Sequence, residues 1–111
     1  MTDYKPGDII VVPFPFSDLS GVKKRPALVL AVAEEKEIVC MMLTSVSKGS
    51  CLEYPLADWK EVGLLKPTVA RIHRIFTITV SSVLDKIGQI DHVEFKQILG
   101  ELARYLIIGK K

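Results

Sequence analysis

The side chains in this sequence that could bind or transform a ligand are mostly cations and hydroxyls, and they gather in three short stretches. The first stretch is Lys23-Lys24-Arg25, the second runs from Thr44 to Lys48, and the third runs from Arg71 to Arg74. The planar fork of an arginine side chain matches the oxygens of a phosphate group. The candidate residues are therefore Lys23, Lys24, Arg25, Thr44, Ser45, Ser47, Lys48, Arg71, His73 and Arg74.

Other chemistries have weaker support. No pair of carboxylates stands out as an acid and a base, and the glycines do not form a phosphate-binding loop. A cysteine–histidine hydrolase could be drawn from Cys51 and His73, but neither residue lies in a recognisable nucleophile motif. Cys40 and Cys51 lack the spacing of a zinc site and are expected to be free thiols, so the sequence predicts no metal and no cofactor.

Residues 6–30 are expected to form two strands joined by a loop that carries the first cations. Residues 9–12 are apolar, and Pro13 and Pro15 should end this strand or make it a sheet edge. Turn-forming residues 17–21 predict the loop, and residues 27–30 predict a buried strand after Pro26. This arrangement would present Arg25 to an anion; the alternative is a solvated basic loop between two core strands.

Further strands are expected at 38–43, 52–55, 68–74 with a continuation over 75–78, and 87–90. A charged turn is expected at 34–37, and a small helix is expected to start at Asp58 and to close at Gly63. If 69–74 is one extended strand, Arg71 and His73 share a face and Arg74 points away. Arg71 and Arg74 would then be either phosphate ligands or ordinary salt-bridge and rim residues.

The last segment predicts a helix that starts after Asp91. Asp91 and Glu94 resemble a capping box, with Glu94 on the polar side of the helix. An apolar stripe comprises Phe95, Ile98, Leu99, Leu102 and Leu106. Several short strands and one terminal helix predict a mainly β, or α+β, protein built as a small and strongly curved barrel.

Composition limits the class of protein. The 111 residues are enough for one domain, expected over residues 1–111, and 49% hydrophobic with 25% charged residues suits a compact fold. The net charge of +2 permits a nucleic-acid partner without requiring one. The polar start carries no signal peptide and the apolar stretches are too short for a membrane span, so a cytoplasmic protein without a membrane partner is expected.

Several of these motifs together resemble a known family. Gly7-Asp8-Ile9, residues 13–21 and Lys24-Arg25-Pro26-Ala27-Leu28-Val29-Leu30 closely resemble the opening of MazF/PemK-type toxins, especially the PemK-like branch. Leu43-Thr44-Ser45, residues 67–71 and Phe76-Thr77-Ile78 are similar to later motifs of that family. The resemblance covers nearly the whole chain.

The resemblance implies a compact SH3-like β-barrel of the MazF/PemK/CcdB type with a C-terminal helix, assembled as a homodimer. It implies the toxin of a type II toxin–antitoxin pair, with a cognate antitoxin as partner. Such toxins are metal-independent endoribonucleases that cut single-stranded RNA, often mRNA. The products carry 2′,3′-cyclic phosphate and 5′-OH ends. DNA binding through a toxin–antitoxin complex is left open.

The family's catalytic arginine corresponds to Arg25, and its hydroxyl residue corresponds to Thr44. Ser45, Arg71, His73 and Arg74 are then candidates for catalytic support, and Lys23, Lys24, Ser47 and Lys48 are candidates for RNA binding.

Phe76 departs from the family pattern, since many MazF-type members carry a second arginine at this position. Either Arg71 or Arg74 replaces that arginine, or the activity is altered or absent. The alternative function is a non-catalytic SH3-like module that binds nucleic acid or an antitoxin. Phe14 and Phe16 are expected in the core or a dimer interface rather than under stacked bases.

Overall fold

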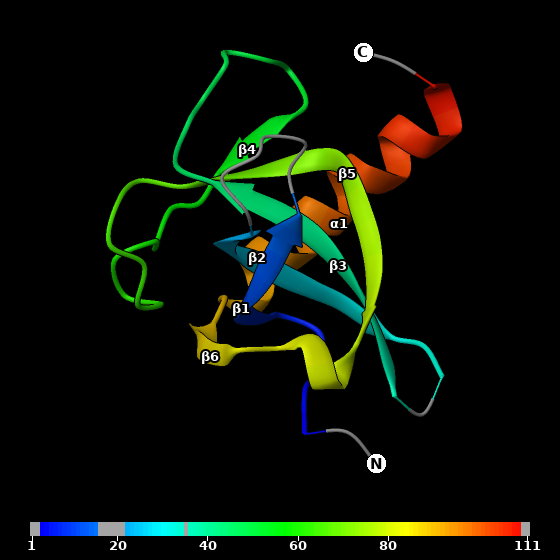
Figure 1. Cartoon of the computed structure of the whole chain (residues 1–111). Coiled ribbons are helices and arrows are strands. Elements are labelled where there is room, and N and C mark those ends of the chain that lie inside the picture. The colour runs from blue at the N-terminus through cyan, green and yellow to red at the C-terminus, as the bar shows by residue number, and fades with distance from the viewer. Residues whose placement is uncertain (1–2, 16–21, 35, 110–111) are drawn as a thin grey trace.

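The structure is a computed structural model that describes residues 3–15, 22–34 and 36–109. Its elements in chain order are β1 (Asp8–Pro15), β2 (Val22–Val32), β3 (Glu37–Thr44), β4 (Glu53–Pro55), β5 (Val69–Thr79), the 3-10 helix η1 (Val80–Ser82), β6 (Asp85–Gln89) and α1 (His92–Ile108) (Figure 1). The turn expected at 17–21, Phe16 and the side chain of Phe14 lie outside the described residues.

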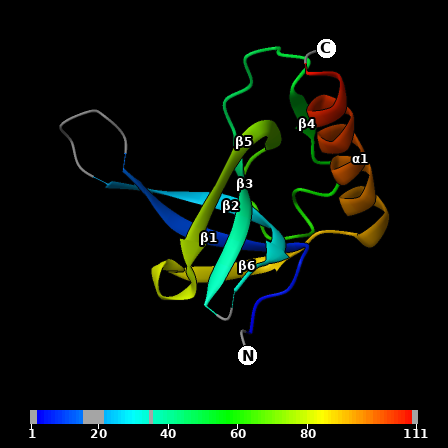
Figure 2. The ribbon, with the colours of Figure 1, turned by 90° about the vertical axis from the view of Figure 1, so that its right-hand side faces the viewer.

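The strands form one antiparallel sheet in the order β4-β5-β3-β2-β1-β6. This sheet is strongly curved, and α1 lies across one side of it (Figure 2). β4 and β6 are the outer strands, so the described part of the sheet is barrel-like without being closed. The predicted mainly β architecture with one C-terminal helix is confirmed.

Both faces of the sheet are buried. Side chains along the central strands point alternately to one face and to the other, and those on each face form an apolar cluster. Ile9, Leu28 and Met41 belong to the set that packs with Phe95 and Ile98 of α1. The opposite set is Ile10, Val12, Ala27, Val29, Ile38 and Cys40, with Phe76, Ile78, Val80 and Val83 packed against it. Successive strand residues point to opposite faces, so near-continuous apolar runs are what a two-sided core requires.

The helix begins as predicted, but Glu94 does not complete a capping box. Asp91 Oδ2 accepts hydrogen bonds from the amides of Val93 at 3.0 Å and Glu94 at 3.3 Å. The Glu94 side chain instead accepts from the Ala57 amide at 2.6 Å, and the residue is buried rather than on a polar side. Leu106 also departs from the predicted stripe, since it is 67% exposed.

Pro13 and Pro15 lie where β1 is a sheet edge, as predicted. Both prolines pair with β2, whereas β6 pairs with β1 only along Asp8–Val11 of β1. The prediction of a basic loop was wrong for Lys23, Lys24 and Arg25, which lie within β2 opposite residues 12–14. β1 and β2 continue here as a two-stranded ribbon that projects from the rest of the sheet (Figure 2).

Residues 58–64 form hydrogen-bonded turns instead of the predicted small helix. The Val62 amide donates to the Asp58 carbonyl at 3.1 Å and the Leu64 amide donates to the Trp59 carbonyl at 3.0 Å. Gly63 has φ +100°, which closes the turn as predicted and prevents a second helical turn.

Candidate functional site

The site depends on a bend in β5 that the sequence did not reveal. Met41 pairs with Ile75 and Leu43 pairs with Ala70, so Met42 alone on β3 spans the same distance as residues 71–74 on β5. The extra residues make β5 turn sharply, as Figure 1 shows. The alternation predicted for an extended strand is therefore wrong here.

A cleft of about 680 Å³ opens beside this bend. It brings together Arg25 from β2, Thr44 from the end of β3 and Lys48 from the following connection. Arg71 and Arg74 of β5 line the same cleft, whereas His73 does not. Four of the predicted cations and the predicted catalytic hydroxyl thus share one cavity.

The rest of the cleft wall is mainly apolar. Its remaining lining residues are Pro13, Met42, Val46, Ile75, Phe76, Thr77 and Ile78. Apolar and aromatic surface next to guanidinium groups suits a ligand that carries both flat rings and phosphates. The sequence analysis did not single out Met42 or Val46, and their apolar character alone carries no signal for a site.

The hydroxyl of Thr44 is oriented by its own chain. Thr44 Oγ1 accepts a hydrogen bond from the Val46 amide at 3.1 Å. Since this bond uses a lone pair of the oxygen, the hydroxyl hydrogen can be donated to a ligand. The arrangement gives the cleft one oriented neutral donor beside its cations.

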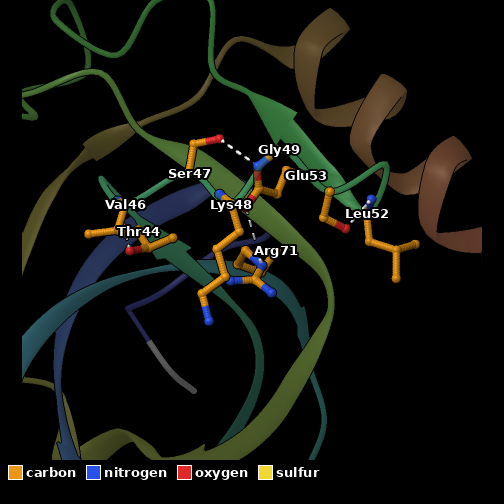
Figure 3. Close-up of polar contacts among 9 residues, drawn as sticks. Thr44, Val46, Ser47, Lys48, Gly49, Leu52, Glu53 and Arg71 are labelled. Carbon is orange, nitrogen blue, oxygen red and sulfur yellow. Dashed lines mark hydrogen bonds and ion pairs between the residues drawn. The ribbon is translucent and has the colours of Figure 1, made fainter.

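Glu53 of β4 is a functional candidate that the sequence analysis missed. Its carboxylate accepts hydrogen bonds from Ser47 Oγ at 2.7 Å and from the Lys48 amide at 2.8 Å, and Arg71 Nε lies 3.9 Å away (Figure 3). The Lys48 amide, and then Ser47 and the Arg71 charge, hold the pKa of Glu53 below its usual value. Glu53 could have been recognised as a candidate because it lies opposite Arg71 on the neighbouring strand. That placement is known only once the register between β4 and β5 is known.

His73 is not a further cation of the cleft at neutral pH. Partial burial, and then the charges of Arg71 and Arg74, lower the pKa of His73 from its usual value. Its Nδ1 atom is buried and has no hydrogen-bond partner among the described residues. His73 is therefore a neutral neighbour of the two arginines.

The other predicted site residues are more dispersed. Ser45 and Lys24 line a second groove of about 450 Å³, which shares Arg25 with the cleft. Lys23 and Ser47 are exposed and line neither groove. In the described part of the chain, no group of three or more His, Cys, Asp or Glu side chains could hold a metal ion. No helix there is long and apolar enough to cross a membrane.

The curved antiparallel sheet with its C-terminal helix matches the MazF-like fold. A family model described as PemK-like, MazF-like toxin of type II toxin–antitoxin systems matches residues 5–106. The chain belongs to this family. No curated protein matches the sequence significantly.

Solved structures with this fold include toxins with and without a partner. A MazE–MazF structure from Deinococcus radiodurans has a TM-score of 0.77 at 20% identity, covering 96% of this chain and 97% of that chain. MazF alone from the same organism has a TM-score of 0.73 at 22% identity, covering 94% and 98%. An endoribonuclease from a mycobacterial species has a TM-score of 0.71 at 16% identity, covering 96% and 93%.

Proposed function

We propose that this chain is a metal-independent endoribonuclease that cleaves single-stranded RNA, such as mRNA, at selected sequences and arrests growth. The supporting observation is the cleft that Arg25, Lys48, Arg71 and Arg74 line together with Thr44 and an apolar wall. Family membership favours the same function. The mycobacterial endoribonuclease of similar fold favours it as well.

In the proposed reaction the ribose 2′-oxygen attacks the adjacent phosphorus and the bond to the 5′-oxygen breaks. The 2′-hydroxyl loses its proton and the leaving 5′-oxygen gains one, which gives 2′,3′-cyclic phosphate and 5′-OH ends. Negative charge builds up on the phosphorane oxygens in the transition state. Arg25 neutralises this charge and Thr44 donates a hydrogen bond to a non-bridging oxygen.

Phe76 stands where many family members have a second arginine, and its surroundings suggest which residue could replace that arginine. Phe76 lines the cleft together with Arg71 and Arg74. In our proposal one of these arginines supplies the second guanidinium, and Phe76 provides apolar contact for a base. Ser45 and Lys24 in the second groove, with Lys23 on the ribbon, would contact the RNA backbone beyond the cleft.

The proposed partners are RNA, a second copy of the chain and a cognate antitoxin. The MazE–MazF structures of similar fold support the antitoxin as partner. DNA would be bound through the toxin–antitoxin complex, and the working compartment would be the cytoplasm. The alternative function, a non-catalytic binding module, is favoured by the single observation that Phe76 replaces an arginine.

A direct test compares wild type, Arg25→Ala and Thr44→Val on a long single-stranded RNA in excess EDTA. Arg104→Ala is the matched control, because it removes an arginine that pairs with Glu101 on the surface of α1. Arg25→Ala should lose about two to four orders of magnitude in rate. Thr44→Val should be slower than the control. A folded wild-type protein that cleaves none of several RNAs would favour the binding module.

A further inference from the structure

We infer that Glu53 is a positioning residue that holds Lys48 and Arg71 in place at the cleft. Its catalytic consequence rests on the proposed ribonuclease function. Glu53 itself does not line the cleft, so it would act only through the residues that it holds. Both of these residues do line the cleft.

The Glu53 carboxylate joins two separate parts of the chain. Oε1 accepts from Ser47 Oγ at 2.7 Å and Oε2 accepts from the Lys48 amide at 2.8 Å, both in the connection after β3. Oε2 also lies 3.9 Å from Arg71 Nε, on β5. The side chain of Glu53 is only 4% exposed, whereas Ser47 and Lys48, which donate to it, are exposed residues.

The connection between β3 and β4 is held by side chains at its start and in its middle. At its start Thr44 Oγ1 accepts from the Val46 amide at 3.1 Å. Further along, Ser47 Oγ both donates to Glu53 and accepts from the Gly49 amide at 3.3 Å (Figure 3). Loss of the carboxylate would therefore release the backbone on both sides of Lys48, while the bond at Thr44 would remain.

Arg71 depends on the same carboxylate for its charge partner. Arg71 is 8% exposed, and its buried Nε atom has no hydrogen-bond partner among the described residues. The Glu53 charge at 3.9 Å is an ion-pair contact rather than a hydrogen bond. A largely buried guanidinium that loses its counter-charge tends to move toward solvent. Without Glu53, Arg71 would no longer be fixed at the cleft wall.

The charge of Glu53 also offsets repulsion among the cations. Arg25, Lys48, Arg71 and Arg74 line a cleft whose described lining contains no carboxylate, and the Glu53 carboxylate lies 3.9 Å from one of these cations, the guanidinium of Arg71. Removal of that charge should make the cleft more attractive to a polyanion and at the same time less ordered. Binding of RNA and catalysis should therefore respond in opposite directions.

The experiment is Glu53→Gln, which keeps the side-chain length and removes the charge. Its amide oxygen can accept from only part of the present donor set. We expect kcat for RNA cleavage to fall about 10-fold or more. Losses of this size are typical when a residue that orients a metal-binding side chain is mutated, and Glu53 would orient Arg71 and Lys48 in the same way. KM should fall, because the cleft without the Glu53 charge attracts the RNA polyanion more strongly. A variant that is simply less folded would lose active protein without lowering KM.

Glu101→Gln is the matched control. It removes the same charge from another carboxylate–arginine pair, that of Glu101 with Arg104 on α1, and Glu101 lines neither groove. The control should cleave RNA at the wild-type rate. Wild type that cleaves RNA, together with Glu53→Gln that is equally fast, would overturn the positioning role and leave the proposed function intact.

A second measurement needs no RNA. Amide hydrogen exchange at Lys48 and the Nε–H signal of Arg71, both followed by NMR, report the two contacts directly. In Glu53→Gln the Lys48 amide should exchange about 10-fold faster or more and the Arg71 signal should shift. Both should be unchanged in Glu101→Gln. Unchanged values in Glu53→Gln would refute the inference, whereas absence of RNA cleavage by wild type would refute the proposed function and the catalytic consequence.

Discussion

Arg71 and Arg74 line the same cleft although they lie three residues apart on one strand. Residues at this spacing face opposite sides of a regular strand. The irregular pairing between β3 and β5 removes that constraint, because residues 71–74 have only Met42 opposite them. A local defect of the sheet thus concentrates positive charge where the proposed chemistry takes place.

Arg74→Ala tests whether this second arginine contributes to catalysis. Arg74 is exposed, so its replacement should leave the fold intact, but cleavage should slow by about two to three orders of magnitude if the guanidinium meets developing charge. The initial rate of RNA cleavage in EDTA measures this effect. Equal rates for Arg74→Ala and Arg104→Ala would show that Arg74 does not supply the second guanidinium. Arg71 would then supply it, or the reaction would proceed without one.

Gly88→Ala should destabilise the protein because the turn at 58–64 packs against the backbone of β6. A Cβ atom at Gly88 would clash with the backbone carbonyl oxygen of Val62. Overpacking of this kind costs about 1–3 kcal/mol in the free energy of unfolding. Urea unfolding followed by circular dichroism measures the change.

Gly100→Ala provides the control for that substitution. A Cβ atom at Gly100 meets no atom within 4 Å, and the residue lies inside α1. Alanine there should raise the free energy of unfolding by about 0.5–1 kcal/mol. Similar effects of both substitutions would show that β6 and the turn are not in close contact.

Glu53 should contribute to the dependence of stability on pH. Its pKa in the folded protein is lowered, mainly by the hydrogen bond from the Lys48 amide. Its stabilising contribution is therefore fully present above the unfolded pKa of about 4.3 and is lost as the pH falls through the folded pKa. The difference in unfolding free energy between wild type and Glu53→Gln should shrink below about pH 4.3. A difference that stays constant from neutral pH to pH 3 would contradict this assignment.

The two cysteines should differ in reactivity. Burial raises the pKa of the Cys40 thiol to about 12, whereas Cys51 is exposed. Because the thiolate is the reactive form, iodoacetamide at pH 8 should modify Cys51 in the native protein and both cysteines after unfolding. Mass spectrometry counts the added groups. Rapid modification of Cys40 in the native protein would contradict its burial between the strands.

The sequence predicts the strands and the helix well because their signals are local. The apolar run at Ile9-Ile10 and the cap at Asp91 each depend on residues within a few positions, and both predictions are confirmed. The bend of β5 depends on how Met41 and Leu43 pair with residues that lie about thirty positions away in the chain. No local pattern records that pairing, so the common placement of Arg71 and Arg74 could not be predicted.

Glu53 and Glu94 show the same limit for polar residues. Both carboxylates accept hydrogen bonds from backbone amides of other segments, those of Lys48 and Ala57. In the sequence, Glu53 is one charge in a short strand and Glu94 fits a capping box. Only the tertiary contacts distinguish these residues from solvated charges. The family resemblance identified Arg25 and Thr44 as a pair, and the structure places both at one cleft.

The most direct test of the proposed function is the chemistry of the RNA ends. Purified protein is incubated with long single-stranded RNA in excess EDTA, and the fragments are analysed by mass spectrometry and by their reactivity toward a 5′-kinase. We expect 2′,3′-cyclic phosphate and 5′-OH ends, formed by wild type and strongly reduced in Arg25→Ala. Intact RNA, or fragments with 5′-phosphate and 3′-OH ends, would contradict the proposed attack by the 2′-hydroxyl.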